Sequence, residues 1–298
     1  MNFNIENGHF TLLWIIANLL CLNVSNFMNK PITILKRSTV SDVIRKLVDH
    51  KISRLIVQEN GKPLGIVTEK DIGFFLWKEY SLRSLDQIFV EEIMKKIVFM
   101  SSPADIKECA TIMIQKDIGS AVLGSNEKLE GILTKTDVIR YFSEYCRGIA
   151  KVVQIKNPGF VSVTTETPLS EVMETMVKNR ISRVIVTDIN GKPLDIITFR
   201  DFFEISLQLA SEEDVTESAA LSGQLRVGFL SEKGFGGVSI ARDVMTPKII
   251  SISPDVDLAQ ACKVMLDSKV NGLIAVDNEG KIGIVSKTDI VRFFTLLD

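Results

Sequence analysis

Apolar residues follow the same scheme at four places along the chain. In each, they recur at positions i, i+3, i+4, i+7 and i+8, the spacing that puts them on one buried face of a helix. The predicted faces are Val40, Val43, Ile44, Leu47 and Val48; Ile106, Cys109, Ala110, Met113 and Ile114; Leu169, Val172, Met173, Met176 and Val177; and Leu258, Ala261, Cys262, Met265 and Leu266. Short apolar runs at 52–57, 118–123, 181–186 and 270–275 follow these helices and predict buried strands.

A second apolar run then leads into a hydroxyl residue and, three positions later, an aspartate that opens another apolar helix. We call this pattern the signature; it spans 65–71, 131–137, 195–201 and 283–289. The aspartates are 66, 64 and 88 residues apart. Repetition on this scale indicates an array of one structural unit, and we number its members copies one to four.

Each copy begins with a short β-rich run. Its reference residue stands 35 positions before the signature hydroxyl in three copies (Thr33, Phe99 and Ser251) and 36 before it in copy three (Ser162). Asn-Gly turns within 59–62 and 189–192 predict hairpins. Each copy therefore reads strand, helix, strand, turn, strand, helix, which predicts an α+β fold of four βαββα-type units.

Two stretches depart from the repeat. Residues 12–22 are almost wholly apolar but too short for an ordinary membrane span, and no Lys or Arg precedes them. A helix packed on the domain, an extension upstream of a natural start at Met28, and a membrane or export segment all remain open. Residues 206–240 form a polar, glycine-bearing insertion, which a solvated linker or a lid or partner-docking element would explain.

Composition narrows the function. Charged residues make up 24% of the chain and the formal net charge is −2, which argues against a nucleic-acid-binding surface. Two histidines are too few to favour a His-based metal site or triad, and no P-loop, nucleophile elbow or HExxH motif indicates an enzyme. The four cysteines, Cys21, Cys109, Cys146 and Cys262, lack CxxC spacing and indicate buried thiols in a reducing compartment, the cytoplasm.

The order of elements, the Ser-Arg run at Ser53–Arg54 and Ser182–Arg183, and the terminal Gly-Ile-Val-Thr-x-x-Asp resemble the CBS (cystathionine β-synthase-type) domain. The resemblance covers 26–84, 90–146, 149–207 and 240–296, leaving an N-terminal extension at 1–25 and an insertion at 208–239. CBS domains pair tandemly into Bateman modules, and two modules commonly assemble head to head into a disc. A chain of four resembles the γ subunit of AMP-activated protein kinase and stand-alone four-CBS proteins of archaea.

The resemblance implies where a ligand binds. An aspartate can accept hydrogen bonds from both ribose hydroxyls, and the family uses the signature aspartate in this way. By motif match, the ribose-binding residues are Asp71, Asp137, Asp201 and Asp289. The hydroxyl residues near ribose or phosphate are Thr68, Thr134, Thr198, Ser286, Thr33, Ser162 and Ser251. A hydroxyl followed three residues later by an acid is also a helix capping box, and both interpretations remain open because a helix N-terminus attracts anions too.

The copies differ in the groups that would complete a site. Arg54 and Arg183 hold matching positions and are the expected phosphate-binding residues, whereas copies two and four carry Ser120 and Gly272 there. Phe99 could fill the space that an adenine needs. In copy three, Asp195 replaces the signature glycine and adds a carboxylate near the site. Copies one and four keep the pattern best, so Asp71 and Asp289 are the preferred sites.

The four basic residues near the signature aspartates are expected to be solvated rather than coordinating, except where a phosphate brings one in; they are Lys70, Lys135, Arg200 and Lys287.

These features predict a non-catalytic regulatory protein that senses AMP, ADP or ATP, with Mg²⁺ as a companion of the nucleotide and no tightly bound cofactor or metal site. Nucleotide binding would bias its conformation and act on a protein partner or a homodimer. The alternatives are an S-adenosylmethionine sensor, which the two arginines disfavour, and a ligand-free scaffold. The composition favours neither nucleic acid nor a membrane as partner.

Overall fold

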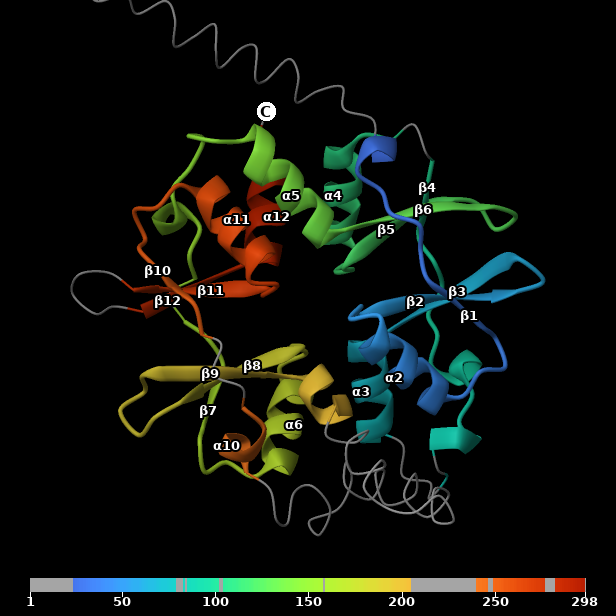
Figure 1. Cartoon of the computed structure of the whole chain (residues 1–298), viewed down its shortest axis with the longest axis horizontal. Coiled ribbons are helices and arrows are strands. Elements are labelled where there is room, and N and C mark those ends of the chain that lie inside the picture. Colours follow the sequence, from blue (N-terminus) through green and yellow to red (C-terminus); the bar gives the residue numbers. More distant parts are fainter. Residues whose placement is uncertain are drawn as a thin grey trace, which may run out of the picture. The chain divides into compact units, whose positions relative to one another are not determined.

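The computed structural model describes residues 24–78, 83, 85–101, 104–157, 159–204, 240–245, 249–276 and 282–297 (Figure 1). The apolar segment 12–22, which contains Cys21, and the whole insertion at 208–239 lie outside the described residues. The three interpretations of the N-terminal segment therefore stay predictions, as do those of the insertion.

Each copy contains the predicted succession of elements. Copy one has β1 (Thr33–Leu35), α2 (Val40–Asp49), β2 (Arg54–Glu59), β3 (Lys62–Thr68) and α3 (Glu69–Lys78). Copy two has β4 (Phe99–Met100), α4 (Ile106–Gln115), β5 (Ser120–Gly124), β6 (Leu129–Thr134) and α5 (Lys135–Tyr145). Copy three has β7 (Ser162–Thr164), α6 (Leu169–Lys178), β8 (Arg183–Thr187), β9 (Pro193–Thr198) and a helix described over 199–204. Copy four has β10 (Ser251–Ile252), α11 (Leu258–Asp267), β11 (Gly272–Val276), β12 (Ile282–Ser286) and α12 (Lys287–Thr295).

All four copies build the same three-stranded sheet. The first strand runs parallel to the second, and the second pairs antiparallel with the third. The four reference residues lie in one register, opposite Ile56, Val122, Ile185 and Ile274. In copy one, Asn60 and Gly61 both have positive φ between the paired Glu59 and Lys62, as a two-residue hairpin turn requires. The α+β class is confirmed.

The predicted helix stripes form the core. In each stripe the first four residues are buried, among them Val40, Val43, Ile44 and Leu47 of α2, and the fifth is partly buried. Thr39 caps α2: its side chain accepts from the Asp42 amide, and Asp42 accepts from the Thr39 amide in return. The same arrangement of Asp105 and Glu108 begins α4. Local capping and the apolar stripe thus agree on where these helices start.

The chain forms two compact units that combine alternate copies. Unit 1 comprises Met1–Pro31, Val98–Gly159 and Ile250–Asp298, and holds copies two and four. In it α5 packs against α11 and α12, and α4 against α12. Unit 2 comprises Ile32–Ile97 and Phe160–Ile249, and holds copies one and three, with α3 packed against α6. Each unit has its own apolar core.

Each copy starts with a segment, ahead of its first strand, that contacts the copy next to its own in the sequence; these segments are 26–32, 90–98, 149–161 and 240–250. We call them straps. The strap of copy one bonds copy two through the Asn29–Ile132 bridge, and the strap of copy two bonds copy one through Lys95–Ile66. Likewise the strap of copy three bonds copy four through Asn157–Ile284, and the strap of copy four bonds copy three through the Pro168–Ile240 bridge. Each of these bridges lies inside one unit: Asn29–Ile132 and Asn157–Ile284 in unit 1, and Lys95–Ile66 and Pro168–Ile240 in unit 2.

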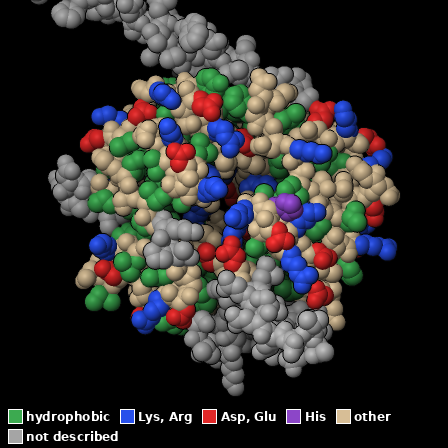
Figure 2. All heavy atoms as spheres, viewed as in Figure 1, with side chains coloured by type: hydrophobic (Ala, Val, Ile, Leu, Met, Phe, Trp, Pro, Cys, Tyr) green, Lys and Arg blue, Asp and Glu red, His purple; other side chains and the backbone are tan. Residues whose placement is uncertain are grey.

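On the face shown in Figure 2, Lys and Arg side chains are interspersed with Asp and Glu. No broad basic area covers this face, as the net charge of −2 leads one to expect. Across the described ranges, none of the helices is both long and apolar enough to cross a membrane.

Candidate functional site

Each signature hydroxyl residue precedes the first turn of a helix and shares a capping box with its aspartate. The amide and the hydroxyl of the first residue both donate to one carboxylate oxygen, Oδ2, of the second. The amide and hydroxyl distances are 3.1 and 2.6 Å for Thr68–Asp71, 2.8 and 2.7 Å for Thr134–Asp137, 2.6 and 2.7 Å for Thr198–Asp201, and 2.9 and 2.5 Å for Ser286–Asp289. The aspartate amide donates back to the hydroxyl in copies one and four, at 3.2 and 3.3 Å, which completes the capping box there. In all four copies Oδ2 already accepts two hydrogen bonds, which leaves Oδ1 as the oxygen for a ligand.

A strap reaches that second oxygen in three copies. Asn29 Nδ2 donates to Asp137 Oδ1 at 2.9 Å, and Asn157 Nδ2 donates to Asp289 Oδ1 at 2.8 Å. The Lys95 ammonium forms an ion pair with Asp71 Oδ1. These strap residues were missed from sequence, although a signal exists: each stands four or five positions before the reference residue of its own copy.

The signature glycines allow the straps to come close. A Cβ at Gly65 would lie 2.7 Å from Met94 Sδ, one at Gly131 2.4 Å from Met28 Sδ, and one at Gly283 2.9 Å from the Asn157 carbonyl oxygen. Side chains there would push the strap away. Copy three has Asp195 at this position, with a buried side chain whose Oδ1 accepts from the Ile196 amide at 2.7 Å.

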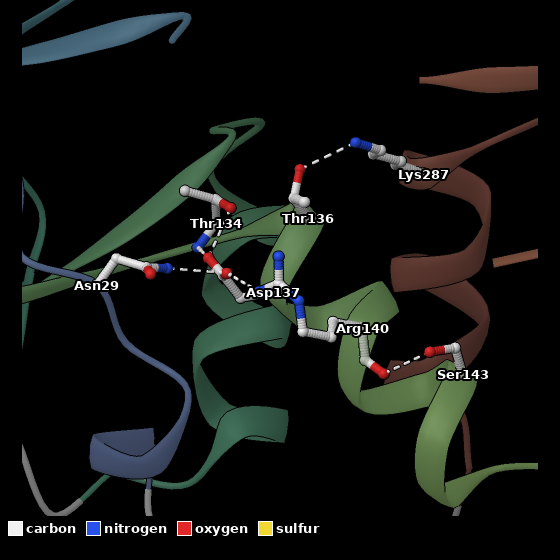
Figure 3. Close-up of polar contacts among 7 residues, drawn as sticks. All are labelled: Asn29, Thr134, Thr136, Asp137, Arg140, Ser143 and Lys287. Atoms are coloured by element: carbon white, nitrogen blue, oxygen red, sulfur yellow. Dashed lines mark hydrogen bonds and ion pairs between the residues drawn. The ribbon is translucent and has the colours of Figure 1, made fainter. Parts of the chain in front are cut away.

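The aspartates differ in how many donors they already satisfy. A carboxylate offers about four acceptor positions. Asp137 fills four, because Arg140 Nη1 donates to Oδ1 at 2.7 Å beside the Asn29 amide (Figure 3). Asp71 takes three, counting Lys95, and Asp289 also takes three, since Arg292 stays 3.8 Å from its Oδ1. Among described residues, Asp137 is thus the most fully bonded of the three.

Asp201 differs in environment. Burial raises the pKa of this carboxyl, and the hydrogen bonds from Thr198 only partly offset the effect. Its charged form is therefore less favoured than that of an exposed aspartate. Residues 246 and 247, which stand four or five positions before Ser251 as Asn29 and Lys95 do before their reference residues, lie outside the described residues.

The structure brings the two predicted arginines next to signature hydroxyls. Arg54 is paired with Thr68 across β2 and β3, and Arg183 with Thr198 across β8 and β9. The reference residues lie in the same sheets but are not level with these pairs. Thr33 is opposite Ile56, which pairs with Ile66, and Ile66 is two residues before Thr68. The phosphate-binding and ribose-binding roles of all these residues stay predictions.

Three of the basic residues that were expected to be solvated instead bind across copies. In unit 1, Lys135 Nζ donates to Thr288 Oγ1 at 3.1 Å and Lys287 Nζ to Thr136 Oγ1 at 2.9 Å. In unit 2, Arg200 binds Glu69 at 2.7 Å. For Arg200, whose side chain is 26% exposed, the expectation of a solvated side chain was wrong, because helix periodicity does not show that two helix N-termini face each other.

The described residues contain no group of three or more His, Cys, Asp or Glu side chains placed to hold a metal ion. Cys109, Cys146 and Cys262 are buried free thiols. Their burial, rather than any pairing, sets their chemistry.

Comparison with known proteins identifies the repeat. The model of the CBS domain family matches residues 24–76, 90–144, 152–207 and 241–295. Protein MJ1225 of Methanocaldococcus jannaschii is 32% identical over 114 residues, which are 35% of this chain and 41% of that protein. Protein MJ1404 of the same organism is 23% identical over 282 residues, 89% of this chain and 62% of that one. The chain thus spans less than two thirds of the length of these two relatives in their alignments.

Solved structures share the fold over most of the chain. The crystal structure of MJ1225, described as a proposed archaeal homolog of g-AMPK, superposes with a TM-score of 0.76 at 23% identity, covering 92% of this chain and 100% of that one. A conserved protein from Pyrococcus horikoshii gives a TM-score of 0.60 at 18% identity and the same coverage. At these identities the likeness shows the fold alone, and the resemblance predicted from sequence is confirmed.

Proposed function

Because the chain belongs to the CBS domain family, we propose that it is a non-catalytic regulatory protein that binds an adenine nucleotide and responds by changing conformation. The observation that carries this proposal is the repeated grouping of a hydroxyl, an aspartate and a strap side chain at a helix N-terminus. That grouping offers acceptors for ribose hydroxyls and donors for an anion in one place.

The preferred sites are those of Asp71 and Asp289. Each keeps about one acceptor position beyond its capping and strap bonds, whereas Asp137 has four donors already. In copy one, Arg54 beside Thr68 supplies a cation for phosphate. Copy two is not a preferred site, because Asp137 already accepts four hydrogen bonds and the half-buried Phe99 stands in its first strand. Its aspartate stabilises the helix and the strap instead.

The test is calorimetry on nucleotide-stripped protein with AMP, ADP, ATP, adenosine and S-adenosylmethionine. Asp71→Ala and Asp289→Ala should each weaken binding about ten- to a hundredfold, because a hydrogen bond to a charged acceptor contributes roughly 1.5–3 kcal/mol. Asp137→Ala is the matched control and should lower thermal stability without changing affinity. If the first two variants bind like the parent, their aspartates are caps only.

Arg54 and Arg183 decide the ligand class. Alanine at either position should weaken the binding of ATP and ADP more than that of adenosine. Added salt should weaken ligand binding by the parent protein in the same order, because salt screens the phosphate contacts. Equal losses for adenosine and ATP would point to a folding defect. Preference for S-adenosylmethionine would overturn the nucleotide assignment, and saturable binding of none of these ligands would leave the scaffold alternative.

A further inference from the structure

Glu69, the first residue of α3, forms an ion pair between copies one and three. Its Oε1 accepts from Arg200 Nε at 2.8 Å and from Arg200 Nη2 at 2.7 Å. The Glu69 side chain is only 16% exposed and that of Arg200 only 26%. This is a largely desolvated ion pair, held at the N-terminal end of a helix.

The pair lies among the groups proposed to bind nucleotide. Glu69 directly follows Thr68, and Arg200 directly precedes Asp201. Arg200 Nη2 also donates to the Ile52 carbonyl at 2.7 Å, which anchors it next to the turn that leads into Arg54. Burial raises the pKa of Glu69, the guanidinium groups of Arg200 and Arg54 act to lower it, and Asp201 acts to raise it.

The acid is peculiar to copy one. The equivalent position carries Lys135 in copy two, Phe199 in copy three and Lys287 in copy four. A negative side chain at this position therefore places an anion among cations where the other copies have a lysine or an aromatic ring. Burial is the largest influence on Glu69 and raises its pKa overall, so the charged carboxylate is held there at a cost in hydration.

We propose that Glu69 is an internal substitute for a ligand phosphate. In the ligand-free chain its carboxylate neutralises Arg200 and the field of Arg54, and a phosphate group displaces it when nucleotide binds. Carboxylate and phosphate accept from the same fork of guanidinium donors, and the phosphate brings more charge. This inference rests on the proposed function and adds a specificity determinant: Glu69 lowers the affinity for phosphate-bearing ligands and leaves adenosine unaffected.

The experiment compares the parent with Glu69→Gln, using ATP, adenosine and inorganic pyrophosphate as ligands in calorimetry and thermal shift. Removing the competing charge should tighten ATP and pyrophosphate by about tenfold, the order expected for one charge partly screened by solvent. Adenosine affinity should stay within about twofold of the parent, since no phosphate competes. Glu59→Gln, at an exposed position of β2 in the same copy, is the matched control and should change nothing.

Glu69→Gln leaves Arg200 without its anion, so the ligand-free variant should melt below the parent and regain more stability from pyrophosphate. If it does not fold, Glu69→Asp withdraws the carboxylate by one methylene and should give the same ligand order with a smaller gain. Unchanged or weaker ATP and pyrophosphate binding in these variants overturns the inference. Tighter binding of pyrophosphate by the variants, with no binding of adenosine, supports the inference but rejects the nucleotide function. If none of the three ligands binds, both proposals are rejected.

Discussion

Gly73 tests whether α3 packs against copy three as described. In an isolated helix, Gly→Ala stabilises by roughly 0.5–1 kcal/mol, because glycine loses more backbone freedom on folding. In unit 2, however, a Cβ at Gly73 would lie 2.3 Å from Phe199 Cε1 and 2.4 Å from Phe199 Cδ1. Phe199 is 1% exposed and its ring meets Phe74 edge to face at 5.9 Å. The ring therefore has no open space to move into.

Packing should win over helix propensity. Overfilling a core costs about 1–3 kcal/mol against a propensity gain of about 0.5–1 kcal/mol, and the midpoints of the two ranges leave a net loss of about 1.25 kcal/mol. For a unit of this size we expect Gly73→Ala to lower Tm by roughly 2–6 °C. The reporter is Trp77, which lies on α3 and packs against the unit 2 core, followed by fluorescence in a Trp14→Phe background.

A double-mutant cycle separates the two effects. In a Phe199→Leu background the ring is gone, so Gly73→Ala should become neutral or stabilising, with a coupling of about 1–2 kcal/mol between the sites. A rise in Tm for Gly73→Ala with Phe199 still present would refute the reasoning. It would mean that α3 and the helix at 199–204 do not approach each other closely.

Three further predictions concern unit 1. The buried Tyr141 hydroxyl makes no hydrogen bond in the described part of the chain. Tyr141→Phe should therefore leave the free energy of unfolding unchanged or raise it by up to about 1 kcal/mol, and Tm should not fall. Burial raises the pKa of Cys109 and of Cys146 to about 12, so in a Cys21→Ser variant a disulfide thiol reagent at pH 8 should label them only after denaturant is added; fast labelling of the native protein would contradict this. Arg140→Ala removes a half-exposed donor to Asp137, so Tm should fall by no more than about 2 °C. If the four donors to Asp137 are what prevents nucleotide binding in copy two, calorimetry on this variant should also show more nucleotide bound per chain.

The sequence predicted the local architecture of this chain well. The period of Val40, Val43, Ile44 and Leu47 marks a buried helix face, and the structure buries all four. The Asn60-Gly61 turn and the order of strands were equally accessible, because both depend on residues close in sequence. Hydrophobic periodicity shows that a face is buried without showing what covers it. The pairing of copy one with copy three in a unit therefore emerged only from the structure.

The sites were predicted in part. The hydroxyl and the aspartate of each signature do meet, as in Thr68–Asp71, because a capping box is local. Contacts from Asn29 or Lys95 join residues far apart along the chain, and no local pattern reveals them. The bond between Arg200 and Glu69 is of the same kind, and it replaced the expectation of a solvated side chain.

The capping boxes also explain how one aspartate can serve both fold and ligand. Oδ2 of each signature aspartate belongs to its helix, so a substitution there unsettles the helix whether or not a ligand binds. In copies one, two and four, Oδ1 contacts a strap side chain, as Asp289 does with Asn157. A nucleotide at Oδ1 must bind beside the strap side chain or displace it. On the proposed function, the sites of Asp71, Asp137 and Asp289 therefore include a strap side chain from the same unit, and a ligand bound at Oδ1 acts directly on that strap.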